Sequence, residues 1–205
     1  MFQIISILSF IVVLGGIGLH RLIYSNWQGP ETQITLGTCR IGPRYFRKLA
    51  FLFGLLSFSV LLFTGFGPLL FGLRLHGYLL MIHATFAPVF IACVAFIAVT
   101  SAEQYAFNEK DLEQIPCPGC KPAKLIAGCC LTDTGLGAKL GFWILLVMSL
   151  PVTLSMVLSM LPLFGPQGQD FLFQAHRWSA LIFALTLIVE LYILIRMRAI
   201  KDTKQ

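Results

Sequence analysis

The chain has 205 residues, of which 57% are hydrophobic and only 12% are charged, and its mean hydropathy is +0.83. Because soluble proteins carry about 25% charged residues, this composition excludes an ordinary soluble domain. The net charge of +6 and the pI of 9.2 would suit nucleic-acid binding in a soluble protein. In so apolar a chain, however, basic residues normally set the membrane topology. We therefore expect the lipid bilayer as a partner and no nucleic acid.

Five apolar runs reach about 20 residues, which is the length needed to cross a bilayer core of about 30 Å. They lie near residues 4–24, 49–71, 75–100, 140–163 and 171–195. The first run has no basic residue before it and no cleavage pattern after it, so it is expected to be a retained span. The sequence thus predicts an all-α integral membrane protein with five transmembrane helices.

The predicted organisation has four parts. Residues 1–25 form an N-terminal transmembrane helix, and residues 26–47 form a cytoplasmic loop. Residues 48–198 form a four-helix bundle that includes a cysteine-bearing loop at 101–139. Residues 199–205 form a tail.

The basic residues are distributed very unevenly between the two sides of the membrane. Thirteen of them fall in or beside the two long loops and the tail, whereas the short turns and their flanks hold only Arg74 and Arg177. The positive-inside rule places the N-terminus outside and the C-terminus in the cytoplasm, as in a bacterial inner membrane or its equivalent.

Three of the four histidines lie near the predicted outer ends of two spans. His76 and His83 are seven residues apart on the third span, which returns them to one helix face, and His176 lies near the start of the fifth span. Ionisable residues within spans are costly and usually functional. Two imidazoles on neighbouring helices can ligate a b-type haem. We expect His83 and His176 to be the ligands, with His76 as an alternative to His83; each histidine taken singly could instead be structural. His20, at the inner end of the first span, has no histidine partner at its depth and is interpreted as structural or quinone-facing.

Glu190 is the only acidic residue well inside a span, fourteen residues after His176 and therefore on nearly the same helix face. At that depth the nearest basic candidates are Arg47 and Arg44. A buried ion pair between Arg47 and Glu190 would account for both residues. Proton handling at a quinone site is the functional alternative.

At these residues the chain resembles a family, the cytochrome b subunits of membrane formate dehydrogenases and nickel–iron hydrogenases and, more distantly, cytochrome b561-like proteins. The second span opens with Arg44-Tyr45-Phe46-Arg47 and ends with Thr64-Gly65, where the family has Arg-x-x-His and a Thr-Gly ending. The third span carries His83. The fifth carries His176 and then Glu190-Leu191-Tyr192, where the family has a second histidine in a His-x-Tyr context.

The resemblance covers spans two to five and implies one haem. His83 and His176 match the family's outer haem ligands, whereas Arg47 and Glu190 stand where the inner ligands would be and cannot replace imidazole. The first span has no counterpart in the four-helix family. A five-span alternative is the cytochrome b subunit of respiratory nitrate reductase, which usually has two histidines on its second span, where this chain has none.

Five of the six cysteines lie in the predicted cytoplasmic loops, where thiols are normally kept reduced. Cys117-Pro-Gly-Cys120 is a tight knuckle, and Cys129 and Cys130 follow it. Four cysteine ligands suit zinc or an iron–sulfur cluster, with Cys39 able to replace one of them. Disulfides and unligated thiols are the alternatives. Cys93, inside the third span, is interpreted as a small packing residue.

Together these features predict an electron-transfer subunit of a multi-subunit oxidoreductase rather than a catalytic subunit. One haem b near the outer face would exchange electrons between a quinone and a partner redox subunit. His76 and Arg177 are expected near a haem propionate or quinone oxygen, with Phe86, Phe173 and Trp178 packing the macrocycle. The rival from another class is a non-redox membrane anchor or assembly protein with a cytoplasmic zinc or iron–sulfur site. A transporter is less favoured because no inverted repeat is present.

Overall fold

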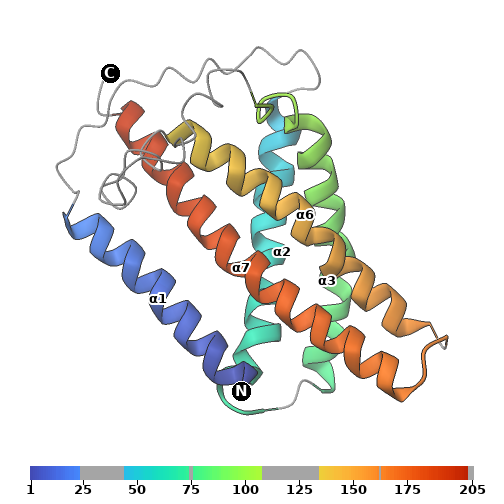
Figure 1. Ribbon diagram of the computed structural model, residues 1–205. Helices are drawn as coiled ribbons and strands as arrows, with labels where there is room; N and C mark the ends of the chain where they lie inside the picture. Colours follow the sequence, from blue (N-terminus) through green and yellow to red (C-terminus); the bar gives the residue numbers. More distant parts are fainter. Residues whose placement is uncertain (24–43, 74–75, 108–133, 162, 203–205) are drawn as a thin grey trace, which may run out of the picture.

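The computed structural model describes residues 1–23, 44–73, 76–107, 134–161 and 163–202 (Figure 1). Within these ranges the chain forms helices and no strand. The helices are α1 (Phe2–Ile23), α2 (Arg44–Leu70), α3 (Tyr78–Ser101), α6 (Thr134–Met160) and α7 (Pro166–Asp202). The prediction of an all-α membrane protein is confirmed.

Each helix contains a stretch long and apolar enough to span a membrane. These stretches are Phe2–Leu22, Phe46–Leu70, Tyr78–Ser101, Gly137–Met160 and Pro166–Arg196. Large apolar side chains cover their outer surfaces, as in Phe63 and Val99, which are 75% and 83% exposed. Contact of such an apolar surface with lipid tails is favourable, whereas its exposure to water is unfavourable.

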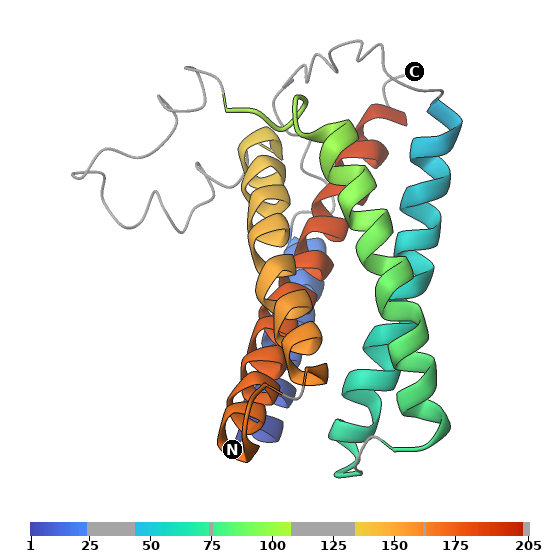
Figure 2. The ribbon, with the colours of Figure 1, turned by 90° about the vertical axis from the view of Figure 1, so that its right-hand side faces the viewer.

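The helices form two antiparallel hairpins and one additional helix. In Figure 2 the α2–α3 hairpin stands beside the α6–α7 hairpin, and the two contact each other through α3 and α6. Helix α1 lies along α7 and touches α2. The N-terminus, the C-terminal ends of α2 and α6 and the N-terminal ends of α3 and α7 share one end of the bundle, here called the short-turn end. The opposite end is called the long-loop end. Which end faces the cytoplasm remains a prediction from the charges.

A Schellman motif ends α2 at the short-turn end. Gly72 has a φ of 68°, which an L side chain rarely adopts, and its N–H donates to the carbonyl of Leu69 at 3.1 Å. The N–H of Leu73 donates to the carbonyl of Pro68 at 2.8 Å. The motif therefore turns the chain sharply toward α3.

Small residues let the helices approach closely. A Cβ on Gly54 of α2 would lie 3.4 Å from the Cβ of Cys93 on α3. Ala138 on α6 and Ala184 on α7 are almost fully buried. Close packing through small side chains is typical of membrane helices, and it agrees with the interpretation of Cys93, which is a free thiol, as a packing residue.

An aromatic cluster joins the two hairpins near the middle of the bundle. The rings of Phe58 (α2), Phe90 (α3) and Phe183 (α7) lie with centroids 5.6 to 6.5 Å apart. Phe90 and Phe183 each lie seven residues beyond a histidine, His83 on α3 and His176 on α7, so each pair shares one helix face.

Candidate functional site

The ring of His83 is held by the end of α2. Its Nδ1 lies 2.9 Å from the hydroxyl of Thr64, and that hydroxyl donates to the carbonyl of Val60 at 2.7 Å. Because the hydroxyl proton is directed to Val60, the Thr64 oxygen accepts and Nδ1 of His83 carries the proton. Gly65 leaves room for the ring, since a Cβ there would lie 3.2 Å from Cε1 of His83. The Thr64-Gly65 pair thus has a local structural role.

The ring of His176 is held by α6 in a similar way. Its Nδ1 lies 3.1 Å from the carbonyl oxygen of Val152, with the hydroxyl of Ser155 at 3.4 Å. A carbonyl only accepts, so Nδ1 of His176 also carries the proton. In both rings Nε2 therefore keeps its lone pair, which is the state in which imidazole binds a metal.

The two histidines lie next to each other, as the sequence predicted. Their ring centroids are 6.5 Å apart and their planes meet at 81°. A metal bridging two imidazoles, with bonds of about 2 Å and nitrogens about 1 Å from the ring centres, would set those centres about 6 Å apart. The observed spacing fits such a bridge.

The composition of the site restricts what it could hold. Among the residues that the structure describes, no group of three or more His, Cys, Asp or Glu side chains could hold a metal ion. A metal ion such as zinc usually has three or four protein ligands, whereas a haem brings four nitrogens and requires only axial ligands from the protein. The pair of His83 and His176 therefore fits a haem better than a free metal ion.

Two of the other residues expected around the haem, Arg177 and Trp178, contact α1. His76 precedes α3 and is exposed. Arg177 is turned toward α1, with its guanidinium carbon 4.2 Å from the ring centroid of Phe2 and 5.4 Å from that of Phe173. Trp178 packs edge-on against Phe2 at 4.9 Å. The residue after His176 points about 100° away around α7, so Arg177 and Trp178 face the first helix and not the histidine pair.

The expected ion pair between Arg47 and Glu190 is not formed. Glu190 is 5% exposed, and its Oε2 has no hydrogen-bond partner among the described residues. Its carboxyl group lies against Gly141 of α6, where an added Cβ would clash with it. Glu190 is thus directed to α6, along which α7 packs. The inner pair of positions thus holds neither imidazoles nor an ion pair.

The predicted cysteine site concerns Cys39, Cys117, Cys120, Cys129 and Cys130, which lie outside the described residues. A zinc ion or an iron–sulfur cluster at these residues stays a prediction from the sequence.

The structure adds a polar cluster at the long-loop end that the sequence did not indicate. Nδ1 of His20 lies 2.7 Å from the hydroxyl of Tyr192, and Nη1 of Arg196 lies 3.2 Å from Nε2 of His20. These contacts join α1 to α7. Tyr192 and Arg196 are four residues apart and so share a face of α7, which the sequence could indicate, whereas the approach of His20 depends on the packing of α1 against α7.

No protein-family model, curated protein or solved structure matches the chain.

Proposed function

We propose that this chain is a membrane-embedded b-type cytochrome subunit that passes electrons between a quinone pool and a partner redox subunit. One haem is held by His83 and His176, near the short-turn end, which the charges predict to be the outer face. The observation that supports this most directly is the pair of rings 6.5 Å apart, each with Nδ1 engaged by a neighbouring helix.

The residues of the chain have separable tasks in this proposal. A haem iron supplies reversible one-electron chemistry when bound. Thr64 and the carbonyl of Val152 fix the orientation and tautomer of the two imidazoles, since such partners of metal-binding histidines tune ligand basicity. Catalysis of a substrate reaction would belong to a partner subunit.

One haem, and not two, is proposed for each chain. The second pair of positions in the resembling family falls on Arg47 and Glu190, which are not ordinary axial ligands. The closeness of Gly141 to the Glu190 carboxyl supports this, because helix α6 lies directly against the side chain.

The test is haem quantitation by pyridine haemochrome and a reduced-minus-oxidised spectrum on the purified, haem-supplied protein. Wild type should contain about one b-type haem per chain, and His83→Ala and His176→Ala should each abolish it. His76→Ala and His20→Ala are the matched controls and should retain the haem. Gel filtration of each variant in detergent distinguishes loss of haem from loss of folding.

Two results would contradict the proposal. If wild type binds no haem, the chain is a non-redox anchor, and the cysteine residues become the place to seek a metal. If the spectrum survives both alanine substitutions, the haem is bound at other residues.

A further inference from the structure

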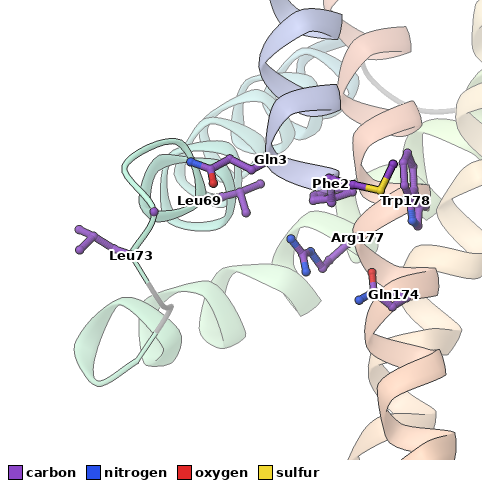
Figure 3. A pocket seen from close by; sticks show the side chains of 9 residues that line it. Phe2, Gln3, Leu69, Leu73, Gln174, Arg177 and Trp178 are labelled. Atoms are coloured by element: carbon purple, nitrogen blue, oxygen red, sulfur yellow. The ribbon is translucent and has the colours of Figure 1, made fainter.

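A cavity lies at the short-turn end, on the side of α7 that faces away from the histidine pair. It is an open depression with a volume of about 530 Å³, lined by the start of α1, the end of α2 and the segment 174–178 of α7 (Figure 3). Volumes of about 300–1,000 Å³ are usual for sites that bind small molecules. The residues of its lining that matter below are Gln3, Gly72, Leu73, Gln174, Arg177 and Trp178.

Arg177 is the charged side chain of this lining. The rings of Phe2 and Phe173 hold its guanidinium by cation–π contacts. Within the described residues, its N–H groups make no hydrogen bond or ion pair, and no carboxylate lines the cavity. Figure 3 shows the side chain reaching from α7 into the space between α1 and the end of α2. A partly buried cation with unused donors favours a ligand with acceptor oxygens.

Two amides add donors and acceptors beside this cation. The Nε2 of Gln3 donates to the carbonyl of Leu70 at 3.3 Å, which fixes the amide and leaves its Oε1 free to accept. Gln174 lies one turn before Arg177 on α7, and the two side chains lie close together in Figure 3. The lining can therefore donate to a carbonyl oxygen and can also accept from a hydroxyl.

We propose that this cavity binds the headgroup of a membrane quinone or quinol. Arg177 and Gln174 donate to an oxygen of the quinone ring, and Oε1 of Gln3 accepts from a hydroxyl of the quinol. Trp178 and Leu73 supply apolar surface for the flat ring, and the lipid-facing end of the helices receives the isoprenoid tail. The Schellman turn at Gly72 borders the cavity on the α2 side.

The position of the cavity suits the proposed electron transfer. Arg177 follows His176 directly, so the cavity and the histidine pair lie on two sides of one turn of α7. The exchange of electrons with a haem rests on the proposed function, but the binding of the headgroup does not.

Tryptophan fluorescence tests the binding directly. In a Trp27→Phe background, the Trp143→Phe variant keeps Trp178 as its reporter, and the Trp178→Phe variant keeps Trp143, whose indole donates to the carbonyl of Tyr105. Both are placed in phosphatidylcholine nanodiscs and titrated with a decyl-tailed benzoquinone, a class of molecule that quenches indole emission. We expect saturable quenching of Trp178 and only a linear, non-saturable loss for Trp143. Equal quenching of the two tryptophans would overturn the proposal.

Substitutions in the cavity give an independent readout. Arg177→Gln should weaken quinone binding about tenfold or more, since hydrogen bonds from a charged donor are among the stronger ones. Gln174→Ala should weaken it as well, whereas Gln169→Ala, an exposed glutamine on the same helix, should not. The Gln174→Ala and Gln169→Ala variants keep the native tryptophans. Their comparison therefore tests quinone binding in the cavity even if the Trp178→Phe variant does not fold. Unchanged affinity in Arg177→Gln and Gln174→Ala would overturn the proposal.

The other possible occupant is the phosphate of an anionic lipid. If replacing phosphatidylcholine with phosphatidylglycerol abolishes the saturable quenching, the cavity is a lipid-headgroup site and the quinone proposal is overturned. Because the signal comes from tryptophan, quinone binding can be measured whether or not the chain contains haem. Quinone binding by a chain without haem would refute only the proposed cytochrome function. Haem binding without quenching would refute the cavity proposal alone.

Discussion

Replacing Thr64 with valine removes the hydroxyl that receives the Nδ1 proton of His83 and keeps the shape of the side chain. In the hydrogen bond between these residues, Thr64 is buried at 7% exposure and His83 is half-buried. Hydrogen bonds between membrane helices contribute about 0.6 kcal/mol on average and at most about 1.7 kcal/mol. An unsatisfied buried donor costs about 1–3 kcal/mol. We expect Thr64→Val to lower the free energy of unfolding by about 1 kcal/mol.

Thr85→Val is the matched control. The Thr85 hydroxyl donates to the carbonyl of Met81 at 2.8 Å, much as that of Thr64 donates to Val60, but Thr85 is exposed and has no contact with a histidine. The difference between the two variants therefore isolates the contact between α2 and α3. Unfolding by sodium dodecyl sulfate in mixed micelles, followed by circular dichroism, measures both. Equal destabilisation by the two substitutions would refute the assigned role of Thr64, and so would failure of Thr64→Ser, which restores the oxygen, to recover stability.

The same substitution has a separate effect on the proposed haem. Loss of a partner of a metal-binding histidine typically reduces metal affinity about 10–100-fold. Thr64→Val should therefore release haem at lower detergent concentrations than Thr85→Val. Identical haem retention in the two variants would show that the hydroxyl does not support a ligand.

Two further substitutions test other contacts. Gly141→Ala should destabilise the protein by about 1 kcal/mol because its Cβ would displace the buried carboxyl of Glu190; Gly15→Ala, which meets nothing within 4 Å, should not. In a double-mutant cycle Glu190→Ala should suppress the effect, and simple additivity would disprove the contact. Tyr192→Phe should lower the free energy of unfolding by about 1 kcal/mol through loss of its 2.7 Å hydrogen bond to the imidazole on α1. Tyr78→Phe, at an 86% exposed position, is the control, and equal effects would show that the bond contributes nothing.

The helices were predictable because bilayer thickness imposes a strong length requirement on apolar runs. The ends of α7 were harder to predict, since hydropathy placed its apolar run at 171–195 whereas the helix extends over Pro166–Asp202. The added residues are largely polar. Pro166 stands at the first helical position, where its missing N–H and fixed φ are favourable.

The equal depth of the two histidines was predictable from the sequence, but their surroundings were not. Equal depth brings His83 and His176 together because both also face the neighbouring hairpin. The same reasoning did not reveal that Arg177 and Trp178 face α1, and it paired Arg47 with Glu190. The rotation of a helix about its axis is set by packing with its neighbours, and an all-round apolar helix carries little periodicity to reveal it. The position of α1 beside α7 was likewise not readable from the sequence, and that position decides where Arg177 points.

The location of the histidine pair near one end of the bundle determines how the membrane potential would act on it. His83 is five residues into α3, about 8 Å along the axis of a helix that is 24 residues long. Carrying one elementary charge across the whole membrane involves about 2.3 kcal/mol per 100 mV. An electron passed between a haem at this depth and a quinone in the cavity beside α7 moves mostly parallel to the membrane plane and crosses little of that field. The transfer step would therefore be nearly independent of voltage and would not by itself charge the membrane.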